Sequence, residues 1–188
     1  MEAWDVIVLG DGPAALHAAA EAAKSGASTL MMSSTGLGNP GMSALEGLSA
    51  PIQESNNRSH REDTIRCGGF LCDQDMVAET TAGAIKHVDL LERRGLNFRR
   101  DQQGLPMVRK AAGHQQPRTV DAGSATALGL QQLGEEQCMR HGVIRRGDQV
   151  PLTLVHTKQS VEGLVAVDMV NGKIIGLQCK ALIIADEG

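Results

Sequence analysis

The stretch VIVLGDGPAAL, residues 6–16, places a glycine turn between an apolar segment and an alanine-rich one. The short apolar run at 4–9 predicts a buried parallel strand. Residues 13–25 favour a helix, and residues 28–32 predict a second strand. Strand, helix and strand therefore fit within ~30 residues, which predicts a βαβ unit with a right-handed crossover.

The glycine turn has the spacing GxGxxA. Gly10 would allow the tight turn, Gly12 would let a pyrophosphate approach the backbone, and Ala15 would let helix and strand pack closely. The start of the helix would face the phosphates with free N–H groups and a partial positive charge. Because the motif lies between a predicted strand and a predicted helix, it indicates dinucleotide binding. A glycine turn that serves packing alone is the alternative.

The second strand ends in Ser33 and Ser34, where a dinucleotide site of the NAD type carries an acidic residue for the adenosine ribose. A hydroxyl hydrogen-bonds a ribose more weakly than a carboxylate does. This difference argues against standard NAD binding and leaves FAD open.

Composition excludes several classes of protein. The 188 residues have a net charge of −4 and no arginine- or lysine-dense block, so no nucleic-acid surface is expected. The four cysteines show no CxxC spacing, which predicts reduced thiols and no metal site. No apolar run reaches the ~18 residues of a membrane span, and no signal peptide is visible. We therefore expect a cytoplasmic protein without direct membrane insertion, at most peripheral to a membrane complex.

The rest of the chain predicts a mixture of loops, helices and strands. We expect a loop over 33–61, helices over 74–94 and 122–141, a β-hairpin over 98–109, and strands over 150–156, 161–169, 173–179 and 181–185. Asp73 and Asp75 would cap the helix that follows them.

Residues 60–75, HREDTIRCGGFLCDQD, resemble the HxxDT…G..LC..D segment of the succinate dehydrogenase, fumarate reductase and L-aspartate oxidase flavoproteins. Residues 90–123 are similar to the family's LxxxGvpFxRxxdGxxxxRxxGGHxxxR stretch, and residues 163–188 to its β-meander and final strand. The resemblance implies that residues 1–188 form an α/β, Rossmann-like FAD-binding domain with a parallel sheet and an added antiparallel β-meander. It also implies an irregular, flavin-facing excursion over about 36–120.

The resemblance further implies which residues hold FAD. The pyrophosphate cradle would consist of Gly10, Gly12, Pro13, Ala14 and Ala15. Ser33 and Ser34 would lie at the adenosine ribose, and the backbone of Val150 would meet the adenine. The segment along the flavin would be Glu46, Gly47, Leu48 and Ser49, followed by Ala50. Ala185 would lie in the closing turn beside the cofactor.

Two departures from the family pattern affect the cofactor. Members that attach FAD covalently use a histidine in a Ser-His-Thr loop, and Asn39-Pro40-Gly41 occupies the corresponding place here. FAD would therefore bind non-covalently. Asp186-Glu187 replace Thr-Gly of the final turn and would weaken FAD binding by charge repulsion.

The family's substrate-capping domain follows the final turn, and we expect residues 1–188 to lack it. No catalytic residue is therefore assigned, and this chain alone is expected to be inactive. In a longer enzyme, hydride would pass between a C4 dicarboxylate and the flavin, with an iron–sulfur subunit as electron-transfer partner. The alternatives are a fragment of an L-aspartate oxidase and a non-catalytic nucleotide-binding or assembly module that keeps the fold.

Two histidines allow a second interpretation. His60 and Asp63 have the spacing of a catalytic pair, but the resemblance favours a structural or partner-facing role. His114 would lie near the flavin, and a polar structural role together with Arg118 is the alternative.

Overall fold

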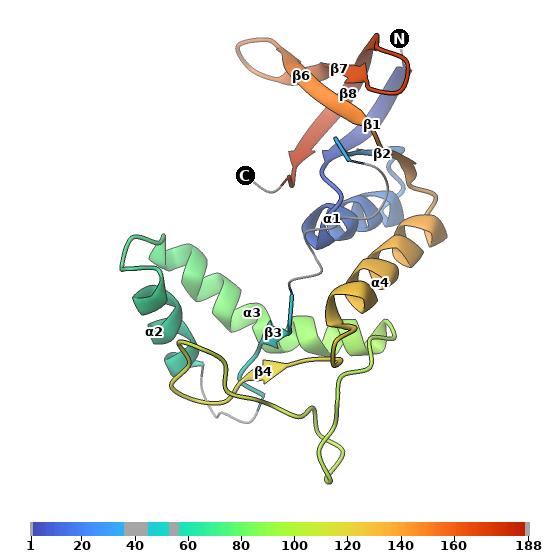
Figure 1. Cartoon of the computed structure of the whole chain (residues 1–188). Coiled ribbons are helices and arrows are strands. Elements are labelled where there is room, and N and C mark those ends of the chain that lie inside the picture. The colour runs from blue at the N-terminus through green and yellow to red at the C-terminus, as the bar shows by residue number, and fades with distance from the viewer. Residues whose placement is uncertain (1, 36–44, 53–56, 187–188) are drawn as a thin grey trace. The chain divides into compact units, whose positions relative to one another are not determined.

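The computed structural model describes residues 2–35, 45–52 and 57–186. The chain forms two compact units. The first unit comprises Met1–Ser43 and Leu130–Gly188, and the second unit comprises Ala44–Gly129. Figure 1 shows the helices and strands of each unit.

The first unit is built on a six-stranded sheet with the order β5-β2-β1-β8-β7-β6. Its strands are β1 (Glu2–Leu9), β2 (Thr29–Met32), β5 (Ile144–Arg146), β6 (Gln149–His156), β7 (Val161–Asp168) and β8 (Lys173–Ile184). β1 pairs in parallel with β2 and β8, and β2 pairs in parallel with β5. β6, β7 and β8 pair antiparallel. This topology confirms the predicted α/β fold with a parallel sheet and an added antiparallel β-meander.

The predicted βαβ unit is present as β1, α1 (Pro13–Lys24) and β2. α1 starts with Pro13 near its first position, where the missing N–H is not needed and the fixed φ suits a helix. Its cap is Ser25, and Gly26 follows with a φ of +93°, a conformation that favours glycine. The local signals at both ends of this helix therefore predict its limits correctly.

Two apolar clusters cover the two faces of the sheet, because alternate residues of each strand point to opposite faces. On one face the parallel strands pack against the meander, through Ile7, Leu9, Leu30, Met32, Leu164, Ala166, Leu177 and Cys179. On the other face the cluster includes α1 and the last part of α4 (Thr126–Arg140), and consists of Val8, Ala15, Leu16, Ala19, Ala20, Met31, Cys138 and Val143. The parallel strands are thus covered by helices on one side and by the meander on the other.

Among its described residues, the second unit holds two complete helices and a small antiparallel sheet. These are α2 (Arg58–Cys67), α3 (Gln74–Arg93), β3 (Leu48–Ser49) and β4 (Thr119–Val120). The Asp73 carboxylate accepts hydrogen bonds from the N–H groups of Asp75 and Met76, which confirms Asp73 as the cap of α3. In the part of the chain that the structure describes, no helix is long and apolar enough to cross a membrane.

Two predicted segments differ from the structure. The loop predicted over 33–61 is wrong at two places, because β3 lies within it and α2 begins at Arg58. This helix has no apolar stripe, and its buried residues are His60 and Asp63. The hairpin predicted over 98–109 forms only in part, with an antiparallel bridge between Arg100 and Pro106 and backbone hydrogen bonds beside it, but without regular strands.

The second half of the chain differs at three further places. α4 begins at Thr126 and not at 122, because the Thr126 hydroxyl accepts the Ala122 N–H and donates to the Gly123 carbonyl, closing a turn ahead of the helix. β5 is a three-residue strand that the sequence does not reveal. The two strands predicted over 173–185 are one strand, β8, whose first part pairs with β7 and whose second part pairs with β1.

Two glycine-to-alanine substitutions in helices should have opposite effects on stability. In α4, a Cβ on Gly134 would lie 2.9 Å from both Cβ and Cδ1 of Leu16, which is fully buried. Gly134→Ala should therefore destabilise the protein by roughly 1–3 kcal/mol through overpacking. In α3, a Cβ on Gly83 would make only an ordinary contact of 3.4 Å with His87. Gly83→Ala should stabilise the protein by about 0.5–1 kcal/mol. Urea denaturation gives the free energy of unfolding of each variant. Equal changes in the two variants would contradict the packing of α1 on α4.

Candidate functional site

The first candidate site lies at the carboxyl ends of the parallel strands, where ligands bind in open α/β sheets. Gly10 follows β1 with a φ of +123°. Its N–H donates to the Met32 carbonyl at 2.8 Å, and the Ala185 N–H donates to the Leu9 carbonyl at 2.8 Å. A Cβ on Gly10 would lie 2.4 Å from the Ala185 carbonyl oxygen. Glycine is therefore required here both by the backbone conformation and by the closing turn after β8.

The N-terminus of α1 faces this edge without a side-chain cap. Gly12 is the N-cap residue, and this cap makes no side-chain hydrogen bond to the helix. The first turn of the helix contains no acidic residue, and Pro13 and Ala14 are exposed. The first N–H groups of the helix, together with its partial positive charge, can therefore receive an anion such as a pyrophosphate.

The turn after β2 is held by the end of β5 and the start of β6. The Ser33 N–H donates to the Arg146 carbonyl at 3.0 Å, and the Gln149 N–H donates to the Ser33 carbonyl at 2.9 Å. The Ser33 hydroxyl donates to the Thr35 carbonyl at 2.7 Å and is buried, whereas Ser34 is exposed. These bonds bring the start of β6, which contains Val150, next to the end of β2.

The structure thus gathers most of the residues predicted for the cofactor at one edge of the first unit. They are Gly10, Gly12, Pro13, Ala14, Ala15, Ser33, Ser34, Val150 and Ala185. The predicted residues Glu46–Ser49 belong to the second unit. Asn39-Pro40-Gly41, on which the prediction of non-covalent attachment rests, lies outside the described residues.

In the second unit, the segment from Glu46 to Ser49 is fixed by close backbone packing. A Cβ on Gly47 would lie 2.6 Å from the Val120 carbonyl oxygen. β3 pairs with β4, and the Ala50 N–H donates to the Arg118 carbonyl at 2.7 Å. Some backbone N–H groups of the segment predicted to run along the flavin, such as that of Ala50, therefore donate hydrogen bonds within the protein.

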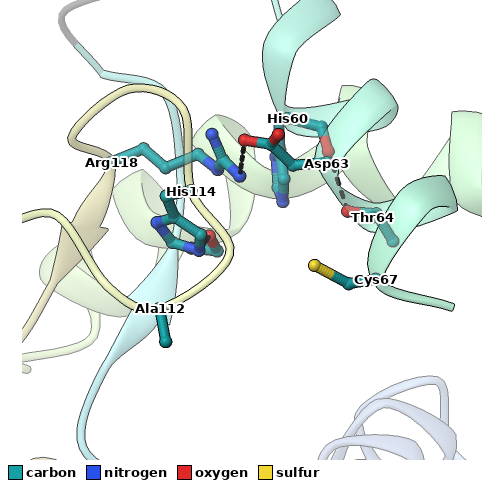
Figure 2. A pocket seen from close by; sticks show the side chains of 8 residues that line it. His60, Asp63, Thr64, Cys67, Ala112, His114 and Arg118 are labelled. Atoms are coloured by element: carbon teal, nitrogen blue, oxygen red, sulfur yellow. Dashed lines mark hydrogen bonds and ion pairs between the residues drawn. The ribbon is translucent and has the colours of Figure 1, made fainter.

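A pocket of about 310 Å³ lies within the second unit (Figure 2). Its lining comes from β3, α2 and the segment before β4, and it combines charged and polar side chains with apolar surface. It consists of Ser49, His60, Asp63, Thr64, Cys67, Ala112, His114 and Arg118. Ser49 Oγ and His114 Nε2 are 3.3 Å apart.

A buried ion pair holds one side of this pocket. Arg118 Nη2 lies 2.8 Å from Asp63 Oδ2, and both side chains are 1% exposed. The Gln115 N–H donates to the same carboxylate oxygen at 2.7 Å. Figure 2 shows the guanidinium and the carboxylate in contact, with His60 and Thr64 on the helix that carries Asp63. Asp63 and Arg118 thus form a buried structural pair. A structural role was the favoured prediction for Asp63 and the alternative prediction for Arg118.

The ionisation of this cluster follows from its burial and its partners. Burial acts to raise the pKa of Asp63, but the hydrogen bonds from Gln115 and Arg118 outweigh it and hold this pKa well below its usual range. Burial, followed by repulsion from Arg118, lowers the pKa of His114. His114 is therefore a neutral imidazole near pH 7. Among the described residues, no group of three or more His, Cys, Asp or Glu side chains could hold a metal ion.

Comparison with known proteins defines the class. The sequence pattern of the family described as FAD binding domain matches residues 5–188, and the chain belongs to this family. The succinate dehydrogenase flavoprotein subunit of Bacillus subtilis is 28% identical over 198 residues, covering 100% of this chain and 34% of the relative. The L-aspartate oxidase of Mesorhizobium japonicum is 30% identical, covering 97% of this chain and 36% of the relative.

A solved structure agrees with these relatives. A variant of the quinol fumarate reductase of Escherichia coli superposes with a TM-score of 0.87 at 25% identity, covering 100% of this chain and 33% of that one. The predicted resemblance to the FAD-binding domains of succinate dehydrogenase, fumarate reductase and L-aspartate oxidase flavoproteins is thereby confirmed. The chain spans about a third of the length of the relatives it matches.

Breaking the buried ion pair should destabilise the protein strongly. Asp63→Asn leaves the Arg118 guanidinium buried without its counter-charge, which should lower the free energy of unfolding by about 3–5 kcal/mol. The neighbouring Glu62→Gln removes an exposed pair with Arg58 and should change it by less than about 1 kcal/mol. Urea denaturation at pH 7 measures both values, and effects of equal size would contradict the role of Asp63.

The same pair sets a pH dependence. The pKa of Asp63 is lower in the folded protein than the value of about 3.9 in an unfolded chain. Its stabilisation is therefore complete above about pH 4 and is lost as the pH falls through the folded pKa. The stability difference between wild type and Asp63→Asn should stay constant from pH 7 to about pH 5 and shrink only in stronger acid. A difference that already shrinks near neutral pH would contradict this assignment.

Proposed function

We propose that this chain is the FAD-binding part of a flavoprotein oxidoreductase that acts on a C4 dicarboxylate, and that it binds FAD non-covalently. The observation that carries the proposal is the uncapped N-terminus of α1 beside Gly10, at the carboxyl ends of β1, β2 and β8. Membership of the FAD binding domain family supports it.

The residues present at this edge fit a dinucleotide. The first-turn N–H groups of α1 would donate to the pyrophosphate, and Gly12 leaves room for its approach. Ser33 would lie at the adenosine ribose, and the backbone of Val150 at the adenine. Ala185 would contact the flavin part of the cofactor. When bound, FAD would supply the group that accepts and returns a hydride.

The relatives support a substrate class and an electron partner for this proposal. Succinate dehydrogenase, fumarate reductase and L-aspartate oxidase are the named activities of proteins that align with nearly all of this chain. Succinate, fumarate and aspartate are all C4 dicarboxylates, so a C4 dicarboxylate is the substrate class we propose for the complete protein. Electrons would leave through an iron–sulfur subunit. Aspartate is the second candidate substrate, because this chain is 30% identical in sequence to an L-aspartate oxidase.

A glycine variant tests the cofactor site. A side chain on Gly12 would fill the space that the pyrophosphate needs, so Gly12→Val should weaken FAD binding by at least about tenfold. This factor corresponds to losing one hydrogen bond to a charged group. Ala82→Val, at an exposed position of α3, serves as the control and should bind FAD as the wild type does. Flavin fluorescence titration gives the affinities, and circular dichroism shows whether each variant is folded. Equal affinity in a folded Gly12→Val would mean that the glycine turn serves packing alone.

The mode of attachment is tested by acid precipitation of the FAD-loaded protein. Because Pro40 cannot form the bond that a histidine forms in covalent members, all flavin absorbance should move to the supernatant. Flavin that stays with the precipitate would contradict non-covalent binding.

A further inference from the structure

One buried carboxylate at the dinucleotide edge has a single hydrogen-bonding partner among the described residues. Asp11 lies between Gly10 and Gly12 and is 7% exposed. The Thr35 hydroxyl donates to its Oδ2 at 2.8 Å. Within residues 2–35, 45–52 and 57–186, Thr35 is the one hydrogen-bonding partner of this carboxylate. Buried carboxylates usually accept several hydrogen bonds, because burial without them is strongly unfavourable.

The position of this carboxylate is that of a ligand-binding crevice. Asp11 follows β1, and Thr35 follows β2. These strands are parallel neighbours, and Leu9 and Met32 are paired at their ends. The hydrogen bond between Asp11 and Thr35 therefore spans the carboxyl ends of two adjacent parallel strands, next to the N-terminus of α1. In open α/β sheets, nucleotides bind outside these ends, and their ribose lies near the end of the second strand.

We propose that Asp11 supplies the carboxylate for the adenosine ribose, because the turn after β2 offers only the hydroxyls of Ser33 and Ser34 for this role. Its oxygen atoms accept hydrogen bonds from the vicinal ribose hydroxyls, in addition to the one from Thr35. This assignment rests on the proposed binding of an adenine dinucleotide. It makes Asp11 a residue that determines which nucleotide binds.

The same carboxylate disfavours a 2′-phosphate. A phosphate on the ribose would place a second negative group beside Asp11. The arginines nearest in the sheet, those of β5, are engaged elsewhere. Arg145 pairs with Glu135 at 3.2 Å, and Arg146 pairs with Glu2 at 2.6 Å. The site is therefore built for an unmodified ribose.

Three ligands and three proteins test this assignment. The ligands are ADP, 2′-deoxy-ADP and ADP with a 2′-phosphate, each titrated by calorimetry or by displacement of FAD. The proteins are wild type, Asp11→Asn and Thr35→Val. Asp11→Asn keeps an acceptor for the Thr35 hydroxyl and removes the charge, whereas Thr35→Val removes the hydrogen bond and keeps the charge.

In the wild type, loss of the 2′-hydroxyl should weaken ADP binding by about tenfold, the expectation for one hydrogen bond to a charged group. The 2′-phosphate should weaken binding further. In Asp11→Asn both differences should fall to about threefold or less, whereas Thr35→Val should retain them.

The outcomes separate this assignment from the proposed function. Wild-type protein that binds neither FAD nor ADP would contradict the proposed function and this assignment together. Wild-type protein that binds FAD but binds the 2′-phosphate ligand as tightly as ADP would contradict the assignment alone, whether or not the variants fold. Undiminished discrimination in a folded Asp11→Asn would also overturn it, and would mean that Asp11 only holds the turn through Thr35.

Discussion

The backbones of Gly10 and Ala185 approach so closely that a single Cβ would lie 2.4 Å from a carbonyl oxygen. This contact joins the first strand of the chain to its last one, across 175 residues of sequence, where β1 and β8 pair in parallel. It depends on a glycine with a φ of +123°, a conformation that residues with side chains rarely adopt. The start of α1, the end of β2 and the closing turn after β8 all meet at Gly10 and its neighbours. The candidate nucleotide site is therefore a consequence of how the sheet closes.

The second unit depends on a different interaction. The ion pair between Asp63 and Arg118 ties α2 to the segment that precedes β4, and both side chains are almost completely buried. Such a pair adds little net stability compared with apolar residues of similar size, but removing one partner is strongly unfavourable. Gln115 and Arg118 hold the pKa of Asp63 low, and burial together with repulsion from Arg118 holds the pKa of His114 below its usual value. The buried charges of Asp63 and Arg118 thus determine the surroundings of Ser49 and His114 in this pocket.

Local sequence signals predict the first βαβ unit well, because each limit is marked by a residue with a strong conformational preference, such as Pro13 and Gly26. They fail where structure depends on distant partners. α2 has no apolar stripe, and it is anchored through Asp63 to Arg118, 55 residues later. β5 contains only three residues, two of them arginines, and it is a strand only because β2 lies beside it. The pairing of Asp11 with Thr35 also joins two turns that no local pattern connects.

The central claim is that the carboxyl ends of β1, β2 and β8 hold FAD. Hydrogen–deuterium exchange of residues 1–188, with and without saturating FAD, tests it most directly. Amides in the first turn of α1 have no partner within the helix and should exchange fast in the free protein. FAD should protect the peptides that contain Gly12–Leu16 and Ser33–Thr35 and leave the exposed end of the β7–β8 hairpin unchanged. Protection confined to other regions, or no protection at all, would contradict this account.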